Sequence, residues 1–281
     1  MYMLLIISYL KANAYLNELC YTNRKDLFLK KGLTMINYKL VLAYDGSKYN
    51  GFQRQSKHPE KTIQGKIEAV LSRLFEEEIQ IIGSGRTDAG VHSHGQTCNF
   101  FSERSIPLDK ISDYLFNYLP KDIAVVNLAI ASPRFHSRYN VVKKCYVYAL
   151  DNNKFADPFT LKYAYHVPEP LNITAMEEAS KHLLGKHDFK SFTSLKSKTK
   201  STVRTIYSIN FAVSGSKIQI TYEGDGFLQH MVRILTGTLV EVGLELKSPN
   251  EIPGILEALE RAKAGATAPS HGLYMEKVFY D

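Results

Sequence analysis

The stretch Gly83-Ser-Gly-Arg-Thr-Asp-Ala-Gly-Val-His-Ser-His-Gly-Gln-Thr-Cys-Asn-Phe-Phe101 places four glycines around one arginine, one aspartate and two histidines. It follows the apolar segment 79–82, which we interpret as a strand. Glycines permit turns with positive φ and the close approach of a ligand, so this composition is typical of a functional loop at a strand end. The loop would present Arg86 and Asp88, and the Asp88 carboxylate is the candidate nucleophile or base.

Two other interpretations fit the residue types of this stretch. A glycine-rich loop beside a strand can bind a phosphate group, but residues 83–88 lack the third glycine of a dinucleotide-binding fingerprint. They also lack the Gly-Lys-Ser/Thr ending of a P-loop. The second alternative is a tight turn in which the Asp88 side chain caps its own backbone. Residue types alone support the turn and the catalytic loop equally.

The first half of the chain alternates between strand and helix patterns. Residues 36–44 alternate in hydropathy, which predicts a half-buried strand. Thr62 can cap a helix whose apolar positions share one face, and a second helix is expected at 108–119. The segment 123–130 indicates a buried strand. The resulting order is β-α-β-β-α-β, a split unit with its helices on one face of an antiparallel sheet.

The second half continues with strands and helices. A strand at 143–148 places Tyr146 and Tyr148 on one side, where such pairs usually join the core. Arg233 lies outside the apolar stripe of its predicted helix, where its ordinary role would be that of a surface cation. The other expected elements are a helix begun by a capping box at 174–177 and ended by Gly185, a hairpin of 203–213 and 218–222, the Arg233 helix at 227–239, a helix at about 251–264 and a final strand ending at Tyr280.

Residues 86–92, Arg-Thr-Asp-Ala-Gly-Val-His, with Gly85 before them and Gly95-Gln96 after them, resemble the active-site signature of the TruA-type tRNA pseudouridine synthases. Further segments match the family in order: 44–53, 135–139, 146–148, 185–192, 231–233 and 268–275. The resemblance covers nearly all of residues 35–281. It implies an α+β fold of two ferredoxin-like (RRM-like) halves, 35–139 with the catalytic loop and 140–281. Their mainly antiparallel sheets would form a central sheet with a cleft between the halves.

The resemblance also implies a reaction. This family isomerises uridines to pseudouridine at positions 38–40 of the tRNA anticodon stem-loop, and Asp88 would be the nucleophile, attacking C1′ or C6. Arg86 would fill the space left by the flipped base. Tyr146 would stack on the extruded uracil and assist the later removal of the proton from C5. Arg233 would pair with Asp88 and keep it ionised, since an opposite charge within about 4–6 Å favours the charged form.

The same resemblance implies no metal, nucleotide or redox cofactor, and its partners would be tRNA and a second copy of the chain in a homodimer. His92 and His94 form a His-x-His pair without a third ligand, so we interpret them as loop structure or RNA contacts. Cys145 and Val147 stand where relatives often place other residues, such as arginine. Any contact those family side chains make does not carry over to this chain.

Charge and composition add modest support for an acidic partner. The formal charge is +7, but residues 1–34 contribute +3 of it. The loop 47–55 combines aromatic residues with cations, as RNA-binding surfaces do. A Ser/Thr-rich loop can be solvated or can hold an RNA backbone. Its basic residues are Lys196, Lys198, Lys200 and Arg204.

The chain has no sequence signature of secretion or of a membrane protein. Three cysteines without a CxxC pair indicate neither a disulfide framework nor a zinc site. No apolar run reaches the roughly 18 residues of a membrane span. We therefore expect a cytoplasmic protein. Residues 1–34 lie outside the family resemblance, and our hypothesis is that Met35 is the biological start and that the leader is translated upstream sequence.

Two other functions stay open at this point. A non-catalytic RNA-binding or chaperone protein can use the same scaffold, because a scaffold does not fix function. The presence of Asp88, Arg86, Tyr146 and Arg233 disfavours it. A nucleotide-dependent enzyme would use the glycine loop for phosphate, and the missing fingerprint glycine and lysine disfavour that.

Overall fold

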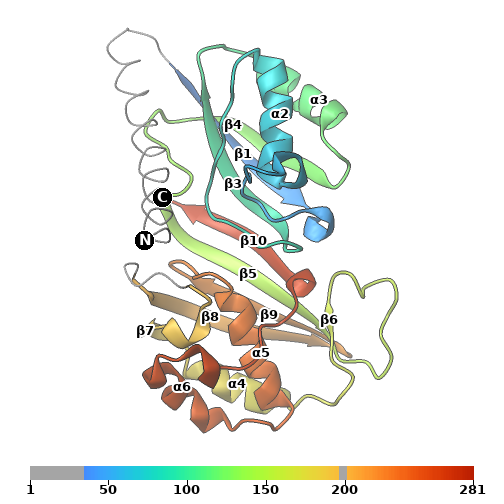
Figure 1. Ribbon diagram of the computed structural model, residues 1–281, viewed down its shortest axis with the longest axis vertical. Coiled ribbons are helices and arrows are strands. Elements are labelled where there is room, and N and C mark those ends of the chain that lie inside the picture. The colour runs from blue at the N-terminus through green and yellow to red at the C-terminus, as the bar shows by residue number, and fades with distance from the viewer. Residues whose placement is uncertain (1–34, 196–200) are drawn as a thin grey trace, which may run out of the picture.

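A single mixed sheet runs through the molecule (Figure 1). The computed structural model describes residues 35–195 and 201–281, so the leader 1–34 and Lys196, Lys198 and Lys200 of the predicted basic loop lie outside it. The strands are β1 (Ile36–Tyr44), β2 (Ile82–Gly83), β3 (His92–Ser102), β4 (Ile123–Ala131), β5 (Val141–Asp151), β6 (Tyr165–His166), β7 (Gly185–Asp188), β8 (Val203–Ser214), β9 (Lys217–Gly224) and β10 (Leu273–Tyr280). Their order is β4-β1-β3-β10-β5-β9-β8-β7, with β2 beside β3 and β6 beside β5. This mostly antiparallel sheet with its helices is the predicted α+β fold.

The first half of the chain follows the predicted order β-α-β-β-α-β. Helices α2 (Ile63–Phe75) and α3 (Leu108–Tyr118) cover one face of β1, β3 and β4 (Figure 1). The alternation along β1 buries Tyr38, Leu40 and Leu42 in an apolar core beneath these helices. Thr62 caps α2 as predicted, because its side chain accepts a hydrogen bond from the Gly65 N–H.

The second half has its own helical layer. Helices α4 (Ile173–Lys181), α5 (Met231–Gly243) and α6 (Ile252–Ala258) pack beside β5, β8 and β9 (Figure 1). Helix α5 is the central one, since its residues are buried on nearly every side. Leu235 and Leu239 of α5 and Tyr148 and Tyr222 of the sheet belong to one apolar cluster.

Strand β10 joins the two halves. It pairs in parallel with β3, where Tyr274 lies opposite His92, and antiparallel with β5, where Met275 lies opposite Tyr146. The start of β3 directly follows the glycine-rich loop. The strand therefore fixes the position of that loop relative to Tyr146.

Three predictions for the first half need correction. The strand expected at 79–82 is reduced to the two residues of β2, although Ile79 and Ile81 are buried. Strand β3 begins at His92, so more of the stretch 83–101 is strand, and less of it is loop, than its composition suggested. Strand β4 is an edge strand whose Val126 and Ile130 are exposed, because no further strand pairs with it in the described sheet.

The predicted helix boundaries of the second half also shift. Asn172, not a capping box at 174–177, caps α4 by accepting from the Ala175 N–H, and Gly185 begins β7. Helix α5 starts four residues later than expected. The predicted helix at 251–264 is broken, because Leu259 adopts left-handed backbone angles directly after α6.

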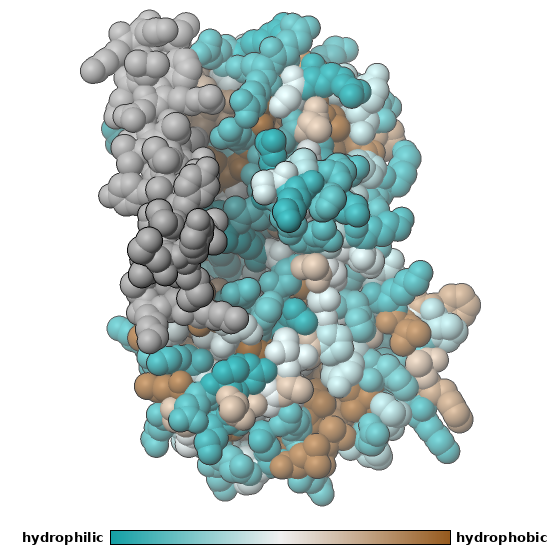
Figure 2. Space-filling view, in the orientation of Figure 1, coloured by the Kyte–Doolittle hydropathy of each residue, from teal (hydrophilic) through white to brown (hydrophobic). Residues whose placement is uncertain are grey.

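The loop between β5 and β6 projects from the body at the right of Figure 1. Its Phe155 and Phe159 side chains are 78% and 89% exposed, and Figure 2 shows hydrophobic residues gathered over this projection. Cys98 and Cys145 are buried free thiols. Among the described helices, none is long and apolar enough to cross a bilayer.

Candidate active site

The loop between β2 and β3 presents Asp88 on a tight turn. The Val91 N–H donates to the Asp88 carbonyl at 3.2 Å, and Gly90 has φ +77°, which favours glycine. The Asp88 side chain contacts Arg233 and His230 rather than its own backbone. The tight turn is therefore present, but the Asp88 side chain is directed at Arg233 and His230 and does not cap its own backbone.

The neighbouring segment 49–52 holds this loop from the side. Phe52 N–H donates to the Thr87 carbonyl at 3.1 Å, and the Tyr44 and Thr87 hydroxyls are hydrogen-bonded at 2.8 Å. Gly51 has φ +96°, and a Cβ there would lie 2.7 Å from the Thr87 carbonyl oxygen. The carbonyl of Gly51 accepts from the Ile63 N–H at the start of α2. The close approach of two backbones thus requires a glycine at this position.

Arg233 reaches Asp88 from the first turns of α5. Its Nη1 donates to Asp88 Oδ2 at 3.2 Å, and its Nε donates to the Ala268 carbonyl at 2.8 Å. The arginine side chain is 16% exposed and the aspartate side chain 28% exposed, so this ion pair is partly shielded from water. The second contact fixes the direction of the guanidinium, which is therefore aimed at the carboxylate.

His230 is a neighbour of Asp88 that sequence reasoning missed. Its Nε2 lies 3.5 Å from Asp88 Oδ2, and its Nδ1 lies 2.9 Å from Ser194 Oγ. The residue has φ +61° and directly precedes α5. The predicted helix over 227–239 included His230. The only sign in the sequence that His230 lies near Asp88 was therefore its spacing of three residues from Arg233.

Tyr146 of β5 lies close to Asp88 of the glycine-rich loop. Its ring is buried and meets the edge of Phe227 with centroids 5.2 Å apart. Burial, and then the nearby Tyr44 and Asp88, raise the pKa of Tyr146 far above its usual range. The residue is therefore a neutral phenol at physiological pH, suited to stacking and unsuited to acting as a phenolate base.

An open, largely polar cleft of about 350 Å³ lies over this site. It is lined by Asn50, Gln53, Arg54, Gln55, Arg86, Thr87, Asp88, Ala89 and His230. The structure therefore places Arg86 and Asp88 in the lining of one cleft, with Arg233 in contact with Asp88 and with Tyr146 close to it. Asn50, Gln53, Arg54 and Gln55 of the loop 47–55, interpreted from sequence as a candidate RNA surface, also line the cleft.

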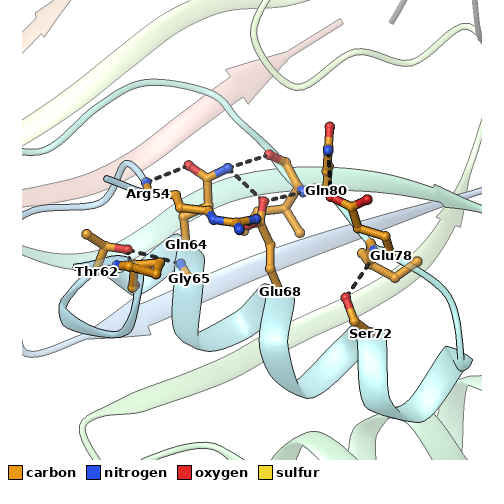
Figure 3. Close-up of polar contacts among 11 residues, drawn as sticks. Arg54, Thr62, Gln64, Gly65, Glu68, Ser72, Glu78 and Gln80 are labelled. Atoms are coloured by element: carbon orange, nitrogen blue, oxygen red, sulfur yellow. Dashed lines mark hydrogen bonds and ion pairs between the residues drawn. The ribbon is translucent and has the colours of Figure 1, made fainter. Parts of the chain in front are cut away.

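A hydrogen-bond network centred on Glu68 of α2 links Arg54 of the cleft lining to the segment before β2 (Figure 3). The buried carboxylate accepts from Arg54 Nη1 at 3.2 Å, from Gln64 Nε2 at 2.8 Å and from the Ile81 N–H at 3.0 Å. Burial raises the pKa of Glu68 in spite of these donors. The side chain thus ties Arg54 of the cleft lining to the segment that leads into the glycine-rich loop.

The two histidines of the loop sequence have separate structural contacts. His92 is buried, accepts from the Gly46 N–H at 3.1 Å and lies 3.1 Å from the His271 carbonyl oxygen. His94 stacks on Tyr274 and lies 2.7 Å from Glu276. In residues 35–195 and 201–281, no group of three or more His, Cys, Asp or Glu side chains is arranged to hold a metal ion.

Comparison with known proteins adds a sequence relationship to this geometry. A family model described as tRNA pseudouridine synthase matches residues 40–140 and 179–281. The chain is 46% identical over 244 residues to tRNA pseudouridine synthase A 2 of Bacillus cereus (strain ZK / E33L), covering 87% of this chain and 99% of that protein. It is 46% identical over 246 residues to tRNA pseudouridine synthase A of Brevibacillus brevis, covering 88% and 100%.

A weaker structural similarity is to the crystal structure of the archaeal box H/ACA sRNP Nop10-Cbf5 complex. It has 11% sequence identity and a TM-score of 0.34, and it covers 74% of this chain and 43% of that one.

Proposed function

Since the chain belongs to the TruA family of tRNA pseudouridine synthases, we propose that it isomerises uridines at positions 38–40 of the tRNA anticodon stem-loop, with Asp88 as the nucleophile. The observation that carries this proposal is the contact of Arg233 with Asp88, which lines an open cleft. A guanidinium fixed by a second hydrogen bond holds the carboxylate in one direction, as a nucleophile requires.

Access to the reacting atoms requires base flipping. A uridine stacked in an RNA stem must leave the stack, at a cost of a few kcal/mol. Arg86 is exposed on the same cleft wall as Asp88, and we assign it to the space that the base vacates. Tyr146 receives the extruded uracil and stacks on it.

The bond changes balance without an added reactant. The Asp88 carboxylate attacks the target nucleotide at C1′ or at C6 of the base, and the N1–C1′ bond breaks. The uracil turns so that C5 faces C1′, a C5–C1′ bond forms and Asp88 is released. The C5 proton is lost and N1 gains a proton, so the product is an isomer of the substrate. Because Tyr146 is neutral, we assign it to holding the base rather than to removing the C5 proton as a phenolate.

The assembly around this reaction is part of the proposal. Residues 35–139 and 140–281 act as the two halves that flank the cleft, and the enzyme works in the cytoplasm as a homodimer on tRNA. The polar wall of residues 50–55 and the cationic Arg54 suit an RNA backbone.

Mapping of pseudouridine in tRNA incubated with the purified protein tests this function. Asp88→Asn should keep its tRNA affinity and form no pseudouridine, whereas Asp113→Asn on the exposed face of α3 should behave as wild type. Pseudouridine formation by Asp88→Asn would refute the nucleophile. A wild-type protein that binds tRNA without modifying it would be a non-catalytic RNA-binding protein. Stabilisation by nucleotides in a thermal-shift screen would instead favour a nucleotide-dependent enzyme.

A further inference from the structure

Three cations from different segments converge beside the catalytic loop. We call Arg138, Lys144 and Arg204 the cationic cluster. Lys144 Nζ donates to the Ser84 carbonyl at 2.9 Å and would lie 2.8 Å from a Cβ at Gly85. Lys144 therefore lies directly under the loop that carries Arg86 and Asp88.

The position of Arg138 follows from the contacts of Ser137. Ser137 Oγ donates to the carbonyl of Ile82, its N–H donates to Asn99 at 2.9 Å, and its carbonyl accepts from Tyr280 at 2.7 Å. Ser137 is fully buried, whereas Arg138 is exposed. The backbone at 137 is thus fixed to the strand that enters the catalytic loop, and the next side chain emerges beside it.

The position of Arg204 follows from strand register. Lys144 of β5 lies opposite Gly224 of β9, and Gly224 lies opposite Ile206 of β8. Arg204 precedes Ile206 by two residues, and its Nε would lie 3.6 Å from a Cβ at Gly226. Gly224 at the end of β9 and Gly226 just after it have no side chains, and these two glycines lie between Lys144 and Arg204.

The cluster has an excess of positive charge. Among the residues that the structure describes, neither Arg86 nor any cluster member forms an ion pair with a carboxylate; the hydrogen bonds of the Lys144 and Arg204 side chains go to backbone carbonyls. Burial, and then the charges of Arg138 and Arg204, lower the pKa of Lys144 to about 8. Burial, and then the charge of Arg138, also lower the pKa of Arg86. Mutual repulsion of this kind is relieved by a bound anion.

We propose that the cationic cluster binds a backbone phosphate of the RNA strand next to the flipped uridine; this inference rests on the proposed function. A phosphate is the anion that an RNA substrate brings to a site beside its target nucleotide, and arginine binds its oxygens through two parallel N–H donors. The phosphate would hold the strand beside Asp88, while Asn50 and residues 53–55 line the cleft.

The test combines protein and RNA changes. Arg138→Gln and Arg204→Gln are compared with wild type and with Arg73→Gln, an exposed arginine on α2, after thermal unfolding confirms that each variant is folded. Affinity for anticodon stem-loop RNA is measured against salt concentration. Loss of one phosphate contact should lower the salt slope by about 0.7–0.9 and weaken binding, while Arg73→Gln changes neither.

A second measurement locates the phosphate. Stem-loop RNAs that each carry one neutral methylphosphonate are bound to wild type and to both variants. One position near the target uridine should weaken wild-type binding and leave the binding of Arg138→Gln unchanged, since that variant has already lost the contact. Additive losses at every position, or an unchanged salt slope in both variants, would overturn the phosphate site. Wild-type pseudouridine formation is followed in parallel, so failure of the site is distinguished from failure of the proposed function.

Discussion

Replacement of Arg233 by methionine removes the cation that contacts Asp88 and retains much of the apolar length of the side chain. In the folded protein the guanidinium makes two hydrogen bonds, at 3.2 Å to Asp88 Oδ2 and at 2.8 Å to the Ala268 carbonyl. The variant keeps the carboxylate but leaves it without its fixed donor. We expect slower chemistry with little change in tRNA affinity, because Arg233 faces the carboxylate.

The size of the effect follows from the exposure of the pair. A hydrogen bond to a charged group contributes about 1.5–3 kcal/mol. Water can partly replace the lost donor, because the Asp88 side chain is 28% exposed, so the lower end of this range applies. About 1.4 kcal/mol in the barrier is a factor of ten, so the rate should fall about 10-fold. The rate of Arg233→Lys should lie between those of wild type and Arg233→Met, since one ammonium group cannot keep the fork-like geometry that joins Asp88 to Ala268.

Single-turnover pseudouridine formation with enzyme in excess over tRNA measures this step apart from binding. Arg261→Met is the matched control, because Arg261 also contacts the segment before β10, through the Ala264 carbonyl and Thr267, without reaching Asp88. A folded Arg233→Met variant whose single-turnover rate constant equals that of wild type would refute the assignment of Arg233. Equal losses in both methionine variants would point to a general effect on the fold.

Two further predictions concern backbone geometry and pH. Gly51→Ala should lower the free energy of unfolding by about 1–3 kcal/mol and slow catalysis, because the new Cβ meets the Thr87 carbonyl. Gly215 also has positive φ but has open space around it, so Gly215→Ala should lose stability and keep its activity. Urea unfolding and activity assays check both variants, and full activity of a destabilised Gly51→Ala variant would contradict the link between this contact and catalysis. The pKa of Lys144 falls from 10.5 to about 8, so the native protein binds fewer protons than the unfolded chain between these values and its free energy of unfolding should rise with pH across that window. Lys144→Met should lack this component in urea titrations at pH 7.5 and pH 10, and an identical pH dependence in both proteins would disprove it.

Local patterns in the sequence predicted much of the fold. The alternation of β1 and of β9 appears as expected, because one face of each of these strands is buried. The β8–β9 hairpin also forms, but β8 has a register shift between Ile206 and Ser208, and Tyr207 and Val213 of its predicted apolar face are exposed. Thr62 was identified as a cap because its side chain acts within one turn. The capping residue Asn172 was missed, since Thr174 and Glu177 have the spacing of a capping box.

Features that depend on contacts between distant segments of the chain were harder to predict from the sequence. Residues 79–82 look like a strand by composition, but only Ile82 and Gly83 find a pairing partner on β3. Strand β4 is apolar enough to suggest burial, yet its place at the edge depends on the order of all the other strands. His230 approaches Asp88 only because α5 begins after it. The contact of Arg233 with Asp88 was expected from family resemblance, whereas the Ala268 carbonyl that orients Arg233 carries no sequence pattern.

The position of β10 has a consequence for biosynthesis. Strands β3 and β5 emerge from the ribosome long before residues 273–280, yet each needs β10 as a neighbour. Until that strand is translated, both remain edges with unpaired backbone groups, which are prone to pairing with other chains. A nonsense mutation just before residue 273 would remove none of Asp88, Tyr146 and Arg233, yet it would divide the sheet between β3 and β5 and leave both strands as edges prone to aggregation.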